Sequence, residues 1–467
     1  MQDFLSKAVD AIAYFVGKAD SYVWSSYGVL PLLVLTGIYL MFGLKCMPWR
    51  YIIPAFSHMI RGRKTTAGHE GELSPFNALM ASMAATVGTG NIVGVATAIM
   101  IGGPGAVFWM WVTALFGMAT KCCETMLAVK FREVTPNGSY VGGPMYYIKN
   151  GLGKNFKWLA FLFAVFGMVA SFGIGNMTQA NSVALNLNST FFGDGETSRV
   201  VIAFSMLLIT AAVLIGGVKR IGSVAGTLVP FMAIFYIIVG LVIMGLNYEK
   251  IIPVFASIFG DAFTGTAAVG GFTGSTLALA MQSGVARGLF SNEAGLGSAP
   301  IAHATAITDS PVRQSFLGML DPFIDTIMVC SITAITILIA GDWSNESARG
   351  TAAILTSQAF DHAIPGGRYL VSIGLMLFAY STILGWSVYG ERCCMYIFGH
   401  KASLPFRIIF SLVVPLGALA ELNLVWDISD LFNGLMAIPN LVALLLLSPV
   451  CFKMVKDYFN DPANRGL

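Results

Sequence analysis

The residues with the clearest chemical potential interrupt an apolar stretch, residues 75–101, with the run Ala84-Ala85-Thr86-Val87-Gly88-Thr89-Gly90-Asn91. In hydrocarbon every backbone N–H and C=O group must be satisfied within the protein, so irregular backbone is tolerated only where it is buried or lines a cavity. Glycine at positions 88 and 90 permits unusual φ angles and a close approach of other groups to the backbone. The run therefore predicts a helix broken within the membrane, whose freed N–H and C=O groups can hold a ligand.

The composition is that of a membrane protein. Of the 467 residues, 56% are hydrophobic and 11% are charged, with a mean hydropathy of +0.74, which excludes an ordinary soluble domain. The net charge of +3 gives no indication of nucleic-acid binding. The seven cysteines fall mostly in apolar runs without a CxxC pair, so we interpret them as small buried residues. Residues 1–20 mix apolar and charged side chains, which is typical of an interfacial amphipathic helix.

The apolar stretches predict the number of membrane spans. A spanning helix needs about 20 mainly apolar residues. By this measure the chain is an all-α polytopic membrane protein of about eleven transmembrane helices, over residues 25–45, 75–101, 105–131, 156–186, 199–217, 223–246, 262–286, 314–340, 369–397, 404–421 and 426–452. A tail, residues 453–467, follows the last of them.

The distribution of basic residues predicts the orientation in the membrane. If the loop from Lys45 to Ser74 is cytoplasmic and the sides alternate, 21 of the 27 Lys and Arg residues lie on the cytoplasmic side. Because basic residues are enriched in cytoplasmic loops, this arrangement is the favoured one. We therefore expect a protein of the cell membrane with an external N-terminus and a cytoplasmic C-terminus.

A second polar, glycine-rich run, Gly270-Gly271-Phe272-Thr273-Gly274-Ser275-Thr276, interrupts the seventh predicted span, five spans after the first interruption. Two five-helix halves, 75–246 and 262–452, would then each open with a discontinuous helix, in opposite orientations because five is odd. The helix at 25–45 would precede this 5+5 core. Corresponding breaks in two halves indicate an inverted-repeat secondary transporter, with its ligands near the bilayer midplane. The alternative is that these glycines only pack helices closely.

Several blocks resemble known transporter families. Val87–Asn91 resembles the broken first helix of the neurotransmitter:sodium symporter fold, and Phe272–Ser275 resembles its broken sixth helix. Three further blocks are similar to the alanine or glycine:cation symporter family: Gly102-Gly103-Pro104-Gly105-Ala106-Val107-Phe108-Trp109-Met110-Trp111, Arg287-Gly288-Leu289-Phe290-Ser291-Asn292-Glu293-Ala294-Gly295 and Gly385-Trp386-Ser387-Val388-Tyr389-Gly390-Glu391-Arg392. The resemblance covers about residues 20–455. It implies symport of alanine or glycine by alternating access, with Na+ as the coupling ion.

The resemblance also implies a substrate site. An exposed helix N-terminus suits a carboxylate, whereas unwound carbonyl groups suit an ammonium group or Na+. The backbone N–H groups of Thr89 and Gly90 would bind the substrate carboxylate. The ammonium group would be received by the carbonyls of the run 270–276 together with its hydroxyl, within the set Phe272, Thr273, Gly274 and Ser275.

A sodium site is implied between the first break and the span at 369–397. Its ligands would be the carbonyls and hydroxyls of Ala84, Val87, Phe378, Ser381 and Thr382. A register that uses Ala379 with Thr382 is nearly as well supported. The hydroxyls of Ser381 and Thr382 can also simply bond back to their own helix.

Other polar residues within the spans leave two interpretations open. Four lie close together in the fourth span, Asn176, Thr178, Gln179 and Asn181, and they could line the pocket or join helices. Among them Gln179 is preferred as a ligand. Trp386 could close over a small substrate or simply pack. Asn433 and Asn440 in the last span carry the same ambiguity.

Four ionisable residues lie within the spans. Lys121 and Glu124 are spaced i, i+3, and Asp321 and Asp325 are spaced i, i+4, so each pair shares a helix face. We expect a structural or gating ion-pair network and not substrate contact, because neither pair falls at a predicted break. Since one aspartate could instead carry a proton, a proton-coupled amino-acid symporter of the same fold is the alternative function.

Other functional classes fit less well. A channel would require rings of charge or a filter motif, which the breaks lack. An enzyme would require a catalytic constellation, but His303 and His362 stand in separate predicted loops and no GxSxG motif is present. We therefore expect a transporter, not an enzyme, whose partners are alanine or glycine and the lipid bilayer, with no nucleic acid and no obligatory protein partner.

Overall fold

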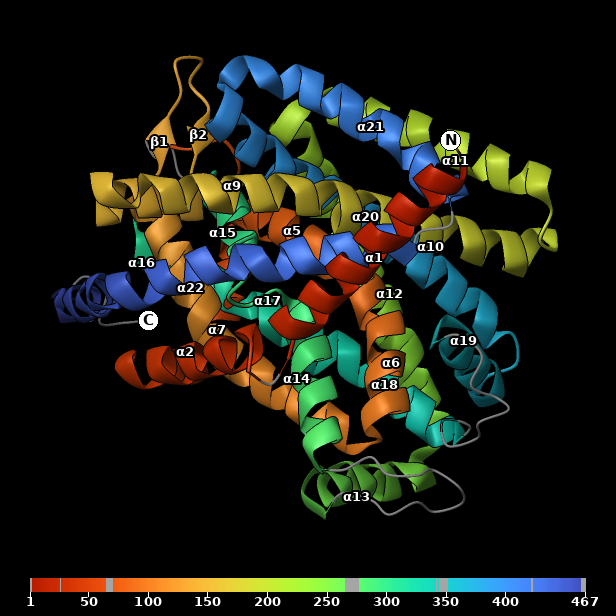
Figure 1. Ribbon diagram of the computed structural model, residues 1–467. Coiled ribbons are helices and arrows are strands. Elements are labelled where there is room, and N and C mark those ends of the chain that lie inside the picture. Colours follow the sequence, from red (N-terminus) through yellow and green to blue (C-terminus); the bar gives the residue numbers. More distant parts are fainter. Residues whose placement is uncertain are drawn as a thin grey trace.

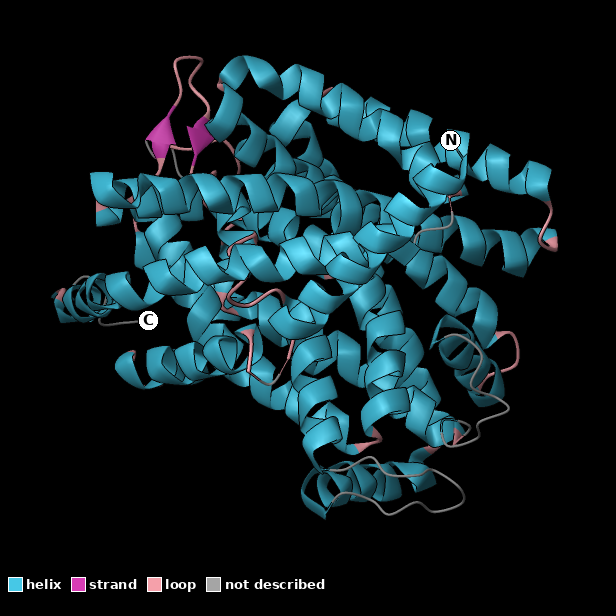
Figure 2. Cartoon of the chain, in the orientation of Figure 1, coloured by secondary structure: helices cyan, strands magenta, loops and turns pink. Residues whose placement is uncertain are grey.

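The computed structural model describes residues 2–25, 27–63, 70–264, 277–341, 343, 352–420 and 423–462. Most of these residues are helical (Figure 2). A short antiparallel hairpin, β1 (Glu133–Val134) and β2 (Tyr140–Val141), pairs Glu133 with Val141 and Val134 with Tyr140.

The helices that precede the hairpin include the first broken one. They are α1 (Gln2–Val23), α2 (Val29–Gly43), α3 (Met47–Arg50), α4 (Ile52–Arg61), α5 (Pro75–Thr86), the 3-10 helix η1 (Thr89–Asn91), α6 (Val93–Gly102) and α7 (Gly105–Lys130). After the hairpin come α8 (Pro144–Tyr147), η2 (Ile148–Leu152), η3 (Lys154–Phe156), α9 (Lys157–Phe172), η4 (Gly173–Met177), α10 (Thr178–Leu187), η5 (Asn188–Phe192), α11 (Glu196–Leu214), α12 (Gly217–Leu246) and α13 (Tyr248–Thr264).

The remaining helices form the second part of the chain. They are α14 (Leu277–Asn292), α15 (Ala299–His303), α16 (Pro311–Gly318), α17 (Leu320–Pro322), the π-helical η6 (Phe323–Cys330), α18 (Ser331–Ala340), α19 (Ala352–Ala363), α20 (Gly367–Phe398), η9 (His400–Ala402), α21 (Ser403–Leu419) and α22 (Asn423–Asn460).

Eight helices or continuous helical runs within the described residues are long and apolar enough to cross a membrane. They are Gly105–Lys130, Lys154–Phe192, Glu196–Leu214, Gly217–Leu246, Pro311–Ala340, Gly367–Phe398, His400–Leu419 and Val425–Asn460. Two shorter apolar helices, α2 and α6, add to them. The prediction of an all-α polytopic membrane protein is therefore confirmed.

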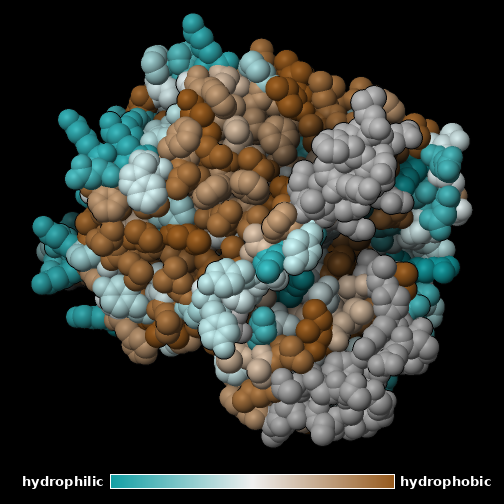
Figure 3. All heavy atoms as spheres, in the orientation of Figure 1, coloured by the Kyte–Doolittle hydropathy of each residue, from teal (hydrophilic) through white to brown (hydrophobic). Residues whose placement is uncertain are grey.

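The surface is consistent with a lipid environment. In Figure 3 hydrophobic residues cover most of the middle of the visible face, and hydrophilic residues gather toward its left and right edges. Large apolar side chains are exposed along α11 and α12, among them Leu208, Phe231 and Leu241 at 70%, 61% and 57%. Exposed apolar area of this extent is unfavourable in water, so these faces are expected to contact lipid.

Two N-terminal helices pack on the last one. Helix α1 crosses α22 in Figure 1, and the Trp24 indole N–H at the end of α1 donates to the Asp430 carbonyl at 3.0 Å. Helix α2 packs against α7 and α22. The interfacial position expected for residues 1–20 and the two five-helix halves remain predictions.

The seventh span, predicted at 262–286, is described only in part. Helix α13 runs to Thr264, and helix α14 runs from Leu277. The break predicted at 270–276, with Phe272, Thr273, Gly274 and Ser275, lies outside the described residues.

The described helices are also interrupted at 293–298, between α14 and α15, and we call this segment the second break. The φ angles of Glu293, Gly295 and Gly297 are +53°, +93° and +81°. Left-handed backbone of this kind cannot continue a right-handed helix and is readily adopted only by glycine. The family-like block that ends at Gly295 thus contains the start of a break that we did not predict.

Candidate functional site

The first break is held open by the side chain of Asn91. Its Oδ1 accepts the backbone N–H of Gly88 at 2.8 Å. In a continuous helix that N–H would donate to the carbonyl of Ala84, which is therefore released from helical bonding. The N–H groups of Thr89 and Gly90 donate to no oxygen of the described residues. The break thus offers two free donors and a freed acceptor.

Helix α20 packs directly against this break. A Cβ atom at Gly88 would collide with the Thr382 hydroxyl, and one at Gly385 would collide with the backbone of Ala85. Glycine at both positions lets the two backbones approach. The side chains that follow Phe378 on α20 consequently reach the unwound carbonyl groups of α5.

Four oxygen atoms converge where α20 meets the break. The Ser381 hydroxyl donates to the Phe378 carbonyl at 2.8 Å and lies 3.4 Å from the Val87 carbonyl. The Thr382 hydroxyl lies 3.0 Å from the Phe378 carbonyl and 3.3 Å from that of Val87. All of these residues are buried. The structure thus brings together Val87, Phe378, Ser381 and Thr382 from the predicted sodium-ligand set.

A small cavity of about 20 Å³ lies beside these atoms. It is large enough for about one water molecule, so it is too small to hold an amino acid in this conformation. The residues that line it come from both breaks and from α5, η4, α10, α14, α20 and α22: Ala85, Thr86, Gly88, Thr89, Gly90, Ile174, Gln179, Phe290, Glu293, Thr382, Trp386 and Asn433.

The second break adjoins the first one at this cavity. A Cβ atom added to Gly90 would lie 3.3 Å from Cα of Ser291 and 3.6 Å from Cδ1 of Phe290. The end of α14 therefore packs on the first break. The first residue of the second break, Glu293, is buried, lines the cavity and accepts a hydrogen bond from the Ser298 hydroxyl at 2.5 Å.

Glu293 was absent from the predicted site. Its signal in the sequence was a lone carboxylate in an apolar stretch, followed by two glycines in Ala294-Gly295-Leu296-Gly297. An ionisable residue at membrane depth is expected to serve a function.

The polar residues of the fourth span divide into two groups. Gln179 lines the cavity, and its Oε1 has no hydrogen-bond donor among the described residues, while its Nε2 donates to the Ile174 carbonyl at 3.0 Å. Asn176 donates to Phe410 O at 2.7 Å, and Asn181 donates to Gly417 O at 3.1 Å, so both join α10 and η4 to α21. Of the predicted polar cluster, Gln179 is therefore the member placed to meet a ligand.

Trp386 and Asn433 complete the wall of the cavity. A Cβ atom at Gly175 in η4 would collide with the Trp386 side chain, so this glycine leaves the space that the indole occupies. Among the described residues, no hydrogen-bond donor contacts the Oδ1 atom of Asn433. Asn440 lies elsewhere, where its amide donates to Glu124 Oε1 at 2.6 Å and to Gly295 O at 2.9 Å.

The predicted ionisable residues form a buried network. Lys121 Nζ lies 3.3 Å from Asp321 Oδ2, and both side chains are fully buried. The same Asp321 oxygen accepts the Ser82 hydroxyl of α5 at 2.6 Å. Lys121 therefore forms its ion pair with a residue of another helix. Through Ser82 this pair also contacts α5, the helix that leads to the first break.

Asp325 forms hydrogen bonds near both breaks. Its carboxylate accepts the Asn91 amide at 2.6 Å, the Ser291 hydroxyl at 2.9 Å and the Thr326 hydroxyl at 2.7 Å. Asn91 belongs to the first break and Ser291 lies two residues before the second. Asp325 does not fall within a break along the chain, but its carboxylate contacts residues of or next to both breaks.

The segments that flank the two broken helices also pair with each other. The Ile307 N–H donates to the Leu73 carbonyl at 2.7 Å in an isolated parallel bridge between Leu73 and Ala306. The Arg132 guanidinium donates to the Ala306 carbonyl at 2.7 Å. A buried ion pair joins Arg392 of α20 to Glu72 at 3.1 Å. These contacts join the segment that precedes α5 to the segment that follows α15 and to α20.

Comparisons with known proteins agree with this architecture. The chain is 49% identical over 446 residues to the sodium/alanine symporter AgcS of Methanococcus maripaludis, covering 95% of this chain and 96% of that protein. It is 37% identical over 451 residues to the probable sodium/glutamine symporter GlnT of Bacillus subtilis, covering 96% and 91%. These relatives are transporters and not enzymes.

The fold is also found in a solved structure. The crystal structure of MhsT in complex with L-phenylalanine matches with a TM-score of 0.54 at 14% identity, over 83% of this chain and 99% of that chain. This likeness confirms the predicted fold of the neurotransmitter:sodium symporters. The family model described as "Sodium:alanine symporter family" matches residues 9–465. With two broken helices meeting at a buried polar cavity in a chain matched along nearly its whole length, this protein belongs to the sodium:alanine symporter family.

Proposed function

We propose that this transporter carries out sodium-coupled symport of small neutral amino acids, alanine or glycine, by alternating access. The observation that carries the proposal is the cavity between the two breaks. There the free N–H groups of Thr89 and Gly90 and the buried carboxyl group of Glu293 line one small space, next to a cluster of uncharged oxygens. A zwitterion needs one partner for each of its charges, and this cavity supplies both.

The substrate carboxylate is assigned to the first break. The N–H groups of Thr89 and Gly90 precede α6 at its N-terminal end, where the helix dipole favours an anion. Stripping water from a carboxylate is costly unless donors replace the lost hydrogen bonds. The two donors without a described partner meet this requirement.

The substrate ammonium group is assigned to Glu293. Its carboxyl group is held by Ser298 on one oxygen and lines the cavity from the second break. A buried carboxylate compensates the charge of an ammonium group better than carbonyl groups do. The carbonyls of Phe272 and Thr273, with Gly274 and Ser275, remain predicted ligands outside the described residues.

The size of the cavity favours a small side chain. Ile174, Phe290 and Trp386 bring bulky apolar groups to its wall. At about 20 Å³ the space must widen even for alanine. A methyl group or a hydrogen requires the smallest displacement of these side chains, which is why alanine and glycine are the proposed substrates.

Sodium is proposed to travel with the substrate at the oxygen cluster. The carbonyls of Ala84, Val87 and Phe378 and the hydroxyls of Ser381 and Thr382 provide uncharged hard oxygens, the kind that unwound transporter helices present to Na+. The same short break presents carbonyls to the ion and N–H groups to the carboxylate. Ordering the break for one ligand therefore prepares it for the other.

Alternating access requires the two broken helices to respond together. Asp325 accepts hydrogen bonds from Asn91 and from Ser291, which supports concerted movement of the two breaks. With the external N-terminus and cytoplasmic C-terminus proposed for the cell membrane, the contacts of Leu73 and Glu72 would close the cytoplasmic side. Inward movement of Na+ would then contribute about 2.3 kcal/mol per 100 mV.

Uptake into vesicles tests the proposal. The purified chain is reconstituted, and uptake of labelled alanine, glycine and leucine is measured with Na+ and proton gradients imposed separately. We expect a Na+ gradient alone to drive alanine and glycine uptake and leucine to be excluded. Uptake driven by a pH gradient without Na+ would overturn the choice of coupling ion.

That second outcome corresponds to the alternative function, a proton-coupled symporter. The observation that favours it is the surplus of buried carboxyl groups around one buried lysine. Glu124, Glu293, Asp321 and Asp325 are all buried near the breaks, and among the described ion pairs Lys121 is paired with Asp321. A surplus of this kind can be neutralised by protons as well as by Na+ and a substrate ammonium group.

A further inference from the structure

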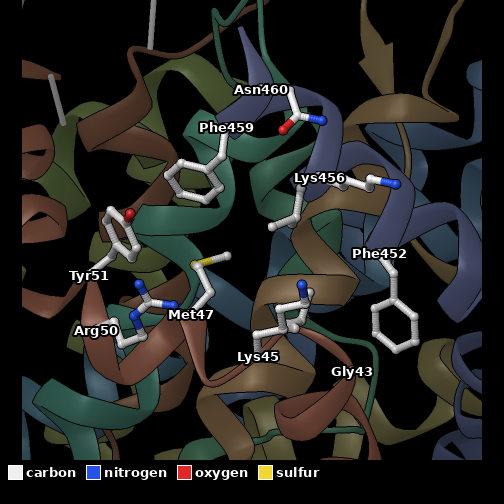
Figure 4. A pocket seen from close by; sticks show the side chains of 11 residues that line it. Gly43, Lys45, Met47, Arg50, Tyr51, Phe452, Lys456, Phe459 and Asn460 are labelled. Carbon is white, nitrogen blue, oxygen red and sulfur yellow. The ribbon is translucent and has the colours of Figure 1, made fainter. Parts of the chain in front are cut away.

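A second cavity lies far from the breaks, between the end of α2, the short helix α3 and the last turns of α22. Its volume is about 530 Å³. Figure 4 shows Lys45 and Arg50 along the lower part of this pocket and Lys456 and Asn460 along the upper part. Cavities of this size are typical of sites for small molecules or lipid headgroups.

The charged side chains that line this pocket are all positive. Lys45, Arg50 and Lys456 line it and are exposed, and no aspartate or glutamate is among the residues that do so. The described ion pairs include none of these three cations. Three basic side chains around one space favour an anion, because each would gain an oppositely charged partner.

The rest of the wall is apolar and aromatic. The Tyr51 and Phe459 rings lie 4.8 Å apart, and Phe452 lies 5.9 Å from Tyr39 of α2. Met47 and Val455 are buried beside them. A free inorganic anion has no apolar part to pack on this surface, whereas the acyl chains of a lipid can bury it.

The backbone places the basic residues at the end of a membrane helix. Helix α2 is apolar up to Gly43, and the chain then turns sharply through Lys45 and Cys46, both with φ of +54°. Non-glycine residues rarely adopt this conformation, and such strain is often retained at functional sites. Trp49 is 39% exposed next to this turn, as expected for an aromatic residue at headgroup level.

We propose that this pocket binds an anionic phospholipid from the leaflet that contacts the loop 45–74. The three cations hold the headgroup phosphate, and the acyl chains lie along the wall of Phe452 and Phe459. Basic pockets between transmembrane helices are suited to such headgroups. The bound lipid joins α2, which lies outside the broken-helix core, to α22.

Thermal unfolding of the full chain in neutral detergent tests this site. Dioleoylphosphatidylglycerol, dioleoylphosphatidylcholine or inorganic phosphate is added at equal phosphate concentration. We expect phosphatidylglycerol alone to raise the unfolding temperature. In the variant Lys45→Gln/Arg50→Gln/Lys456→Gln the half-saturating concentration should rise by about a hundredfold, since each of the three basic residues near an anionic lipid contributes about fivefold.

The matched control removes the same charge outside the pocket. Lys154→Gln/Lys157→Gln/Lys453→Gln changes three exposed lysines that do not line it. This control should keep a half-saturating concentration within about twofold of the natural chain if the pocket acts locally. An equal loss in the control would overturn the proposal, because surface charge alone would then explain binding.

Two further results would also overturn it. Equal stabilisation by phosphatidylcholine would show that the basic residues are not used, and equal stabilisation by inorganic phosphate would show an anion site that does not need lipid. Native mass spectrometry of the folded chain counts bound phosphatidylglycerol directly. This count also decides the case in which the triple pocket variant is less stable without lipid. Fewer bound phosphatidylglycerol molecules on the variant than on the natural chain would support the proposal, and an equal number would refute it.

Discussion

The Asn91 side chain donates to the carboxylate of Asp325 at 2.6 Å, in a buried part of the protein. The same side chain accepts the Gly88 N–H at 2.8 Å, so one amide both opens the first helix and ties it to η6. Asp325 in turn accepts from Ser291, next to the second break. This relationship makes the geometry of the two breaks interdependent.

We expect Asn91→Ala to weaken alanine binding strongly. The substitution returns the Gly88 N–H to the Ala84 carbonyl and removes a hydrogen bond to a carboxylate, which contributes about 1.5–3 kcal/mol. Alanine affinity, measured by binding of labelled alanine, should fall by about tenfold or more. Asn181→Ala is the control, since Asn181 joins α10 to α21 outside the cavity. Both variants should lose stability, and equal loss of alanine affinity in the two would contradict the role of Asn91.

Gly90→Val should abolish alanine binding while protein remains in the membrane. A side chain at position 90 meets Ser291 and Phe290 at the contact between the breaks and covers the N–H groups assigned to the carboxylate. Gly94→Val is the control on the same broken helix, because a Cβ atom there meets nothing within 4 Å. Normal alanine binding by the Gly90 variant would refute the carboxylate assignment.

Thr382→Val should weaken activation by Na+ more than it weakens alanine affinity. It removes one hydroxyl oxygen from the cluster and keeps the shape of the side chain. The Na+ concentration for half-maximal uptake should rise by about fivefold, with alanine affinity at saturating Na+ within about twofold. Thr178→Val removes a buried hydroxyl that bonds to its own helix at Ile174 O and should leave the Na+ dependence unchanged. An unchanged Na+ dependence in the Thr382 variant would remove this residue from the site.

Glu293→Gln should reduce alanine affinity by about tenfold to a hundredfold, the loss expected for a charged hydrogen-bond partner. Binding of L-lactate, which carries a hydroxyl in place of the ammonium group, should change little. Glu124→Gln is the control, because Glu124 is also buried but bonds to Asn440 and does not line the cavity. A loss that is the same for alanine and L-lactate would assign Glu293 a structural role.

Cysteine labelling tests the orientation. Asn155 is exposed at the start of the helical run Lys154–Phe192, and Thr197 is exposed beyond its other end, at the start of α11. In a Cys46→Ser background, Thr197→Cys should react with an impermeant maleimide added outside intact cells, and Asn155→Cys should react only after the membrane is opened. The reverse pattern would invert the topology.

The sequence by itself determined the features that depend on local chemistry. The length of the apolar stretches indicated a helical membrane fold. The glycines at 88 and 90 marked the first break, because the backbone conformation of a short segment depends mainly on the residues within it. The hydroxyls of Ser381 and Thr382 could be placed opposite Val87 only through the resemblance. Gln179 stood out because an amide in an apolar helix needs a partner.

The tertiary structure alone decided which distant residues meet. Hydrogen bonds such as Asn91 to Asp325 join positions 234 residues apart, and no periodicity encodes them. Lys121 could have paired along its own helix with Glu124, but the packing of α7 on α17 brings Asp321 within 3.3 Å. The break at Glu293 escaped prediction because its polar residue resembled an isolated charge. It became part of a site only when α14 packed against Gly90, since close packing, and not local propensity, brings a buried charge to its partner.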